Sequence, residues 1–123
     1  MSENYSSVYD DLKAENANVD QGCVLDPDGN VLFLGGDWDP SADAKELLDQ
    51  WLNHGPRLTV QGTGYSILRS EPEQLISMNL AGKGFVVGSV TKAGNYLIAH
   101  LVPVSAEQAG RDFMDVARAA AKI

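Results

Sequence analysis

The second half of the sequence is divided by short glycine- and proline-containing turns into five apolar runs, and this spacing strongly limits the possible folds. The runs are residues 58–61, 65–69, 75–80, 85–91 and 96–104. The segments between them are too short to hold a helix, so consecutive strands must reverse direction and pair with their neighbours. This half of the chain therefore predicts an antiparallel meander.

The first 34 residues predict a helix followed by a hairpin. Apolar residues at spacings of three and four predict a helix from Ser2 to Lys13. Two apolar runs, residues 22–25 and 31–34, flank the sequence Asp26-Pro27-Asp28-Gly29-Asn30. Proline and glycine in this segment favour a tight reversal, so the two runs predict a β-hairpin.

Two further helices are predicted, one before the meander in the sequence and one after it. Asp39 and Pro40 are typical of a helix N-cap and first turn, and the apolar spacing continues from residue 44 to residue 52. His54 suits the last turn of this helix, and Gly55-Pro56 ends it. The segment Ser105 to Gln108 has a capping-box pattern and begins a C-terminal amphipathic helix.

The order of elements predicts an α+β fold with a single antiparallel sheet and terminal helices packed on it. A chain of 123 residues fits one domain, spanning residues 1–123, and buries a core without crosslinks. Cys23 is the only cysteine, so no disulfide forms within the chain and a reduced compartment fits best. No apolar run approaches the roughly 18 residues of a membrane span, which argues against membrane insertion.

Charge is distributed unevenly along the chain. The net charge is −8, with 17 acidic and nine basic residues, which disfavours nucleic acid as a partner. Residues 1–54 hold 12 of the acids and only two bases, whereas residues 55–123 hold five acids and seven bases. Two interpretations remain open: the folded domain has a mildly basic face that orients an acidic partner, or the charges are ordinary solvated surface.

The sequence gives no positive indication of catalysis. His54 and His100 belong to no nucleophile, base or metal-ligand motif, and a structural or surface role is the simpler interpretation for both. Cys23 lies in an apolar run and is interpreted as a small core residue. We therefore expect a binding protein rather than an enzyme, with no metal and no cofactor.

Several segments together resemble the profilin family over nearly the whole chain. The hairpin sequence from Val24 to Val31 and the helix from Pro40 to Leu52 match the early part of the family pattern. Residues 58–69, LTVQGTGYSILR, are similar to the profilin strand pair with its glycine-containing hairpin and arginine-terminated strand. Residues 76–80, 90–92 and 105–123 match its later strands and C-terminal helix.

This resemblance implies a fold, a function and a set of contact residues. The fold has about seven strands, with the N- and C-terminal helices on one face and a further helix on the other. The function is that of a small, nonenzymatic and monomeric cytoplasmic regulator of the cytoskeleton, which binds monomeric actin, covers its growing-end face and so regulates polymerisation. The implied actin-binding residues are Ser66, Ile67, Leu68, Arg69, Lys83, Val87, Val104, Ser105, Arg111 and Phe113.

The chain departs from the family pattern where eukaryotic profilins bind polyproline. Tyr5 and Tyr9 match the N-terminal aromatics of that surface. The strand tryptophan is replaced by Leu32, and the last helix ends at residues 121–123 without the expected aromatic. We therefore do not expect the usual polyproline surface.

Basic residues are also fewer than in the family pattern. Two positions that carry bases in the family are Gly64 and Ala81 here. Phosphoinositide binding needs a basic cluster, so weak or absent binding is expected. This reduced pattern resembles an archaeal profilin.

Three alternatives remain open. A roadblock- or longin-like scaffold or GTPase-regulatory module shares much of the element order, but a roadblock domain has about three strands after the second helix instead of five. A PAS-like sensor would need an internal pocket.

Phe113 lies on the apolar stripe of the last helix, so core packing competes with a role in binding.

Overall fold

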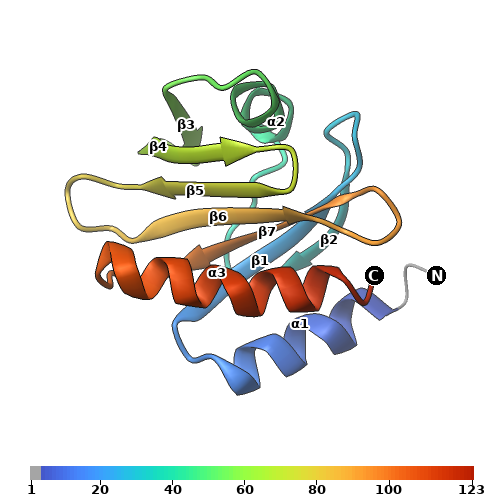
Figure 1. The fold of residues 1–123 in the computed structure, drawn as a ribbon. Coiled ribbons are helices and arrows are strands. Elements are labelled where there is room, and N and C mark those ends of the chain that lie inside the picture. The colour runs from blue at the N-terminus through green and yellow to red at the C-terminus, as the bar shows by residue number, and fades with distance from the viewer. Residues whose placement is uncertain (1–3) are drawn as a thin grey trace.

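Seven strands form one antiparallel sheet in the computed structural model, which describes residues 4–123 (Figure 1). In chain order the elements are α1 (Asn4–Glu15), β1 (Val19–Leu25), β2 (Val31–Gly35), α2 (Ala44–Leu52), β3 (Arg57–Val60), β4 (Thr63–Glu71), β5 (Gln74–Met78), β6 (Phe85–Val90), β7 (Tyr96–Leu101) and α3 (Ala106–Ala120). This order confirms the predicted α+β fold, with five strands after the second helix. Ser2, where the predicted first helix begins, lies outside the described residues.

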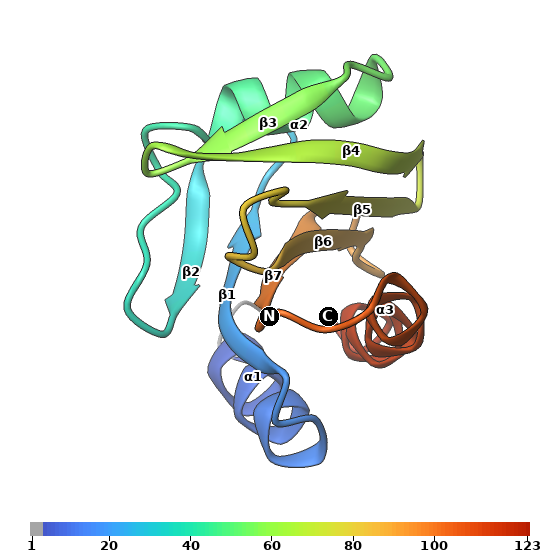
Figure 2. The same ribbon diagram turned by 90° about the vertical axis from the view of Figure 1, so that its left-hand side faces the viewer.

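The strand order is β2-β1-β7-β6-β5-β4-β3, and every neighbouring pair is antiparallel. The meander from β3 to β7 follows the chain, and the β1–β2 hairpin joins it beside β7. Figure 2 shows that the sheet curls strongly, as expected for twisted strands. The β1–β7 pairing closes the two halves of the chain into one sheet.

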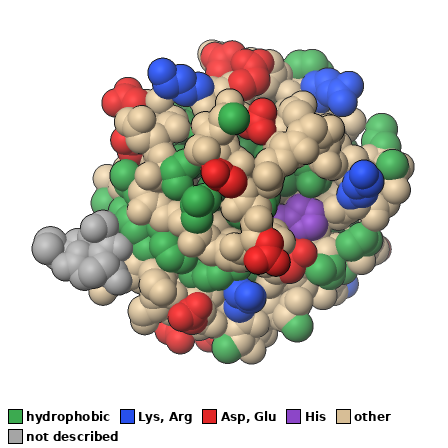
Figure 3. Space-filling view, turned by 180° about the vertical axis from the view of Figure 1, so that it is seen from behind, with side chains coloured by type: hydrophobic (Ala, Val, Ile, Leu, Met, Phe, Trp, Pro, Cys, Tyr) green, Lys and Arg blue, Asp and Glu red, His purple; other side chains and the backbone are tan. Residues whose placement is uncertain are grey.

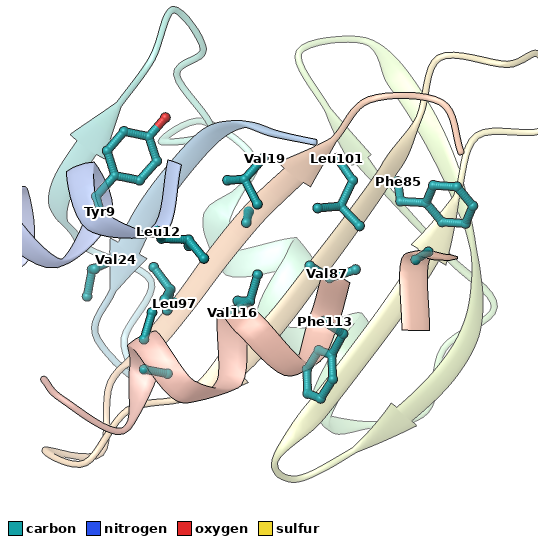
Figure 4. Close-up of a cluster of buried hydrophobic side chains, with 14 of the residues drawn as sticks. Tyr9, Leu12, Val19, Val24, Phe85, Val87, Leu97, Leu101, Phe113 and Val116 are labelled. Carbon is teal, nitrogen blue, oxygen red and sulfur yellow. The ribbon is translucent and has the colours of Figure 1, made fainter. Parts of the chain in front are cut away.

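Helices cover both faces of the sheet. The first and last helices, α1 and α3, lie on one face, and α2 lies on the other, over β3 and β4 (Figure 2). Because side chains alternate between the faces of a strand, the same strands supply two cores. The α1–α3 core includes Leu12, Val87 and Val116, and Figure 4 shows part of it. The α2 core includes Trp51 and Ile98.

The second helix begins later than the sequence predicts. Its N-cap is Asp43, so the prediction of Asp39 and Pro40 as cap and first turn was wrong. The Asp39 carboxylate accepts a hydrogen bond from the Ser41 backbone N–H at 3.0 Å, and the Asp43 N–H donates to the Pro40 carbonyl at 2.9 Å. These local bonds form turns that compete with the helix, and α2 starts only after them.

The last residues of α2 form a Schellman-type end. His54 lies after the helix rather than in its last turn, with a left-handed φ of 57°. The Gly55 N–H donates to the Gln50 carbonyl at 2.7 Å, and the His54 N–H donates to the Trp51 carbonyl at 3.4 Å. His54 occupies the position that glycine usually takes in this motif.

The two ends of the described chain lie close together. Asn4 and Ile123 line the same hollow, together with Lys92 and Lys122. Figure 1 shows the C-terminus beside the start of α1. Within residues 4–123, no helix has the length and apolar character that crossing a bilayer requires.

Candidate protein-binding surface

The sheet leaves part of one face uncovered beside α3. That helix packs mainly on β6 and β7 and reaches β5 less. On β4, Ser66 pairs with Met78 and Arg69 pairs with Ile76. Met78 and Ile76 pack against the α1–α3 core, and directly paired residues point to the same face. Ser66 and Arg69 therefore lie on the α3 side of the sheet, beyond the edge of the helix.

Exposed apolar side chains lie on both sides of this uncovered area. Leu68 occupies a bulge between Ile67 and Arg69 and is 51% exposed. On α3, Met114 is 54% exposed, although the sequence pattern assigned it no role. Asp112 and Asp115 face Asn16 near α1, so Met114 lies on the opposite flank of α3.

The remaining predicted contacts cluster near the start of α3. Lys83 lies in the β5–β6 turn, and Figure 1 shows that this turn and the first turn of α3 are at the same end of the sheet. Ser105 is the N-cap of α3, and its hydroxyl accepts a hydrogen bond from the Gln108 N–H at 3.1 Å. The Arg111 guanidinium donates to the Gln108 side chain at 2.9 Å. Val104 is half-buried before the helix.

We call these exposed or partly exposed residues together the β4–α3 surface. It comprises Ser66, Leu68, Arg69, Lys83, Val104, Ser105, Arg111 and Met114.

Three of the residues implied by the resemblance do not lie on this surface. Ile67 points to the opposite face and packs against the α2 core. Val87 is fully buried, and Phe113 is only 6% exposed. Both belong to the α1–α3 core, where Figure 4 shows them between the sheet and α3. Val87 and Phe113 hold α3 against the sheet and so fix one border of the surface.

Two of the basic side chains near this surface, Arg69 and Arg118, are already paired. Arg69 forms an exposed ion pair with Glu71 at 3.2 Å, and Arg118 pairs with Asp115. Within residues 4–123, neither Lys83 nor Arg57 makes an ion pair. Figure 3 shows acidic and basic side chains together on the face seen from behind, with hydrophobic side chains between them. At the β4–α3 surface, Glu71 beside Arg69 and Asp115 beside Arg118 make the local charge mixed rather than uniformly basic.

A hollow of about 250 Å³ adjoins the β4–α3 surface. Its lining residues are Arg57, Gly64, Ser66, Asn79, Leu80 and Ala81. Gly64 and Ala81 are the two positions where the family pattern expects bases. Leu80 is 74% exposed. The sequence pattern places it at the end of the apolar run 75–80, but β5 ends at Met78 and Leu80 lies in the turn that follows. Sequence reasoning assigned no role to Arg57 or Leu80.

His100 fixes the turn that carries Lys83. Its Nδ1 lies 2.6 Å from Asp20 Oδ1, and its Nε2 lies 2.8 Å from the Lys83 carbonyl oxygen. Both ring nitrogens therefore lie within hydrogen-bond distance of an oxygen atom. This ring links β1, β7 and the β5–β6 turn, which gives His100 the structural role predicted for it.

The aromatic side chains near the N-terminus pack inward. Tyr5 and Tyr9 are buried, and Phe33 of β2 lies against both, with ring centroids 6.3 and 5.7 Å away. Leu32, at the position of the family tryptophan, is 42% exposed. The aromatic side chain that β2 places against Tyr5 and Tyr9 is therefore Phe33, which sequence reasoning missed. Burial, followed by the charge of Asp20, raises the pKa of Tyr9 to about 12.

Residues with catalytic potential are not arranged as a reactive site. Cys23 is fully buried, and burial raises the pKa of its thiol. Among the described residues, no group of three His, Cys, Asp or Glu side chains is placed to hold a metal ion. His54 contacts the Ser70 hydroxyl at 2.9 Å at the end of α2.

Comparison with known proteins finds similar sequences. No protein-family model matches the chain. Loki profilin-3 of Lokiarchaeum sp. (strain GC14_75) is 35% identical over 88 residues, covering 70% of this chain and 72% of the relative. Thor profilin of Thorarchaeota archaeon (strain AB_25) is 29% identical over 123 residues, covering 98% of this chain and 94% of the relative.

Solved structures extend the similarity to the whole fold. The crystal structure of Loki profilin 1 matches with a TM-score of 0.84 at 28% identity, covering 99% of this chain and 96% of the other. Loki profilin 2, solved in a complex with rabbit actin, also matches with a TM-score of 0.84, at 27% identity and with coverage of 99% and 96%.

Proposed function

The chain belongs to the profilin family, and from this premise we propose that it binds monomeric actin and regulates polymerisation by covering the growing-end face of the monomer. The observation that carries this proposal is its similarity, over nearly its full length, to a Loki profilin that has been solved with rabbit actin. Profilins are a nonenzymatic actin-binding family, and we propose that this member also acts by binding alone, as a monomeric single domain in the cytoplasm. The roadblock alternative is not favoured, because five strands follow α2.

The β4–α3 surface is the proposed contact area. It combines exposed apolar side chains, Leu68 and Met114, with the cations Arg69 and Lys83. Apolar anchors with charged residues at the rim are typical of specific protein interfaces. Because the whole chain carries a net charge of −8, the attraction of these cations acts at short range on acidic groups of the partner, and it weakens with salt.

Titration calorimetry tests this function directly. The protein is titrated into monomeric rabbit actin held by latrunculin, at low and moderate salt. We expect saturable binding that weakens with salt. The double substitution Arg69→Glu and Lys83→Glu should weaken the affinity at least about tenfold, because it reverses two charges at the contact.

A matched control separates local charge from total charge. Lys45→Glu with Lys92→Glu makes the same change in net charge away from the β4–α3 surface and should bind like the unchanged protein. Circular dichroism checks that every variant is folded. Unchanged affinity in the folded Arg69/Lys83 variant would exclude this surface, and no binding by the unchanged protein would exclude the function.

A further inference from the structure

We propose that the hollow over Gly64 is an anchor pocket of the actin interface, in which Arg57 receives a carboxylate and Leu80 receives an apolar group of the actin monomer. This inference rests on the proposed function and extends it to two residues outside the predicted contact set. The occupant of the hollow is an acidic side chain of the partner, and an apolar group of the same partner contacts Leu80 beside it. The proposal follows from the placement of Arg57.

Arg57 reaches the hollow from the neighbouring strand. It pairs with Ser66, so its side chain lies on the α3 side of the sheet, together with Ser66. From there the guanidinium crosses Gly64, where its Nη2 occupies space that a Cβ would need. The absence of a side chain at Gly64 therefore allows the cation to lie across β4.

The guanidinium is unpaired within the described part of the chain. Its side chain makes no ion pair and no hydrogen bond with residues 4–123, although it carries five N–H donors. No acidic residue lines the hollow. A planar guanidinium with free donors matches a carboxylate in a two-pronged geometry, so charge complementarity selects an acidic group.

The opposite wall of the hollow is fixed before any partner arrives. The Asn79 side-chain amide donates to the Gly64 carbonyl at 2.8 Å. Its oxygen accepts hydrogen bonds from the Ala81 and Lys83 backbone N–H groups at 2.9 and 3.0 Å. One side chain thus ties β4 to the β5–β6 turn, and a preorganised wall lowers the entropy lost on binding.

Leu80 adds an apolar contact to the same wall. It is the most exposed of the large hydrophobic side chains in the described chain. The turn held by Asn79 presents it to solvent next to Arg57 and Ser66. Because Ser66 also belongs to the β4–α3 surface, the pocket and that surface form one continuous contact area.

Calorimetry with latrunculin-held rabbit actin tests the pocket through three variants. Arg57→Gln should weaken the affinity about tenfold and reduce its salt dependence, because one charge contact is lost. Leu80→Ser should weaken it several-fold. Gly64→Ala keeps every charge but displaces the guanidinium, so a smaller loss of affinity is expected with little change in thermal stability.

The controls distinguish this inference from the proposed function. Lys45→Gln removes one positive charge on α2 and should leave binding unchanged. If Arg57→Gln and Leu80→Ser bind normally while Arg69→Glu with Lys83→Glu does not, the pocket is overturned and the function stands. If the unchanged protein does not bind actin, both fail.

A titration of the protein with inorganic phosphate, monitored by calorimetry and by amide NMR shifts, tests a small anion as the occupant. We expect no saturable binding at the hollow. Saturable binding that disappears in Arg57→Gln would identify a small-anion site and overturn the proposal of a partner carboxylate.

Discussion

Tyr9 shows how a single side chain depends on the residues that make room for it. Its ring lies over Gly22 and Gly35, which pair with each other across β1 and β2. A Cβ at either glycine would overlap the ring. Neither glycine has a left-handed φ, so space rather than backbone conformation requires glycine at both positions. The two glycines form a flat platform that seats α1 on the sheet.

We therefore expect Gly35→Ala to lower the free energy of unfolding by about 1–3 kcal/mol, because the added methyl group displaces a buried aromatic ring. The measurement is urea denaturation followed by circular dichroism. Gly110→Ala is the matched control: Gly110 lies within α3, a Cβ there would meet no atom within 4 Å, and alanine should stabilise the helix by about 0.5–1 kcal/mol. Equal stability of the two variants would contradict the platform.

At the scale of elements, a buried carboxylate joins α3 to the segment after α1. Asp112 is 1% exposed and accepts hydrogen bonds from the side-chain amides of Asn16 and Asn18, both at 3.0 Å. The Gln108 amide donates to it at 2.7 Å. This cluster fixes the N-terminal half of α3, and α3 in turn borders the β4–α3 surface.

Asp112→Ala should lower the free energy of unfolding by about 2–4 kcal/mol, because the Asn18 and Gln108 amides lose the acceptor shown here and the buried Asn16 amide keeps only Asp115. Asp115→Ala is the comparison: Asp115 is less buried, and its partner Asn16 still has Asp112, so the loss should be smaller. Denaturant titration of both variants measures the difference. A smaller effect at Asp112 than at Asp115 would show that the cluster contributes little to helix docking.

Most elements could be predicted because their signals are local. Turn residues and apolar spacing identify all seven strands, and the cap at Ser105 identifies the start of α3. The start of α2 could not be predicted in this way. Asp39 has the right chemistry for a cap, but its backbone N–H donates to Gln61 in the β3–β4 turn at 2.9 Å, a contact between segments distant in sequence.

At the scale of the whole molecule, the candidate site depends on how distant segments meet. Ser66 and Arg69 of β4 lie on the α3 side of the sheet and Ile67 does not, and a contact of any of them with actin stays a prediction. The sequence could not show that Val87 and Phe113 are core residues rather than contacts. An apolar residue in a strand or helix fits the same sequence pattern whether it faces a partner or the core. Arg57 was missed because the position of its side chain depends on the β3–β4 register and on the absence of a side chain at Gly64.

The closeness of Asn4 and Ile123 makes the chain suitable for circular permutation. A flexible linker of about six residues can join these two ends, and new ends can be placed in the exposed β6–β7 turn between Ala93 and Gly94. Because every strand pairing is kept, the permutant should show the same circular dichroism spectrum and the same actin affinity. A permutant that stays unfolded would show that the fold needs the intact β6–β7 turn, which the Gly94 and Thr91 N–H groups close. If it folds, the packing of the sheet and helices does not depend on where the N- and C-termini lie.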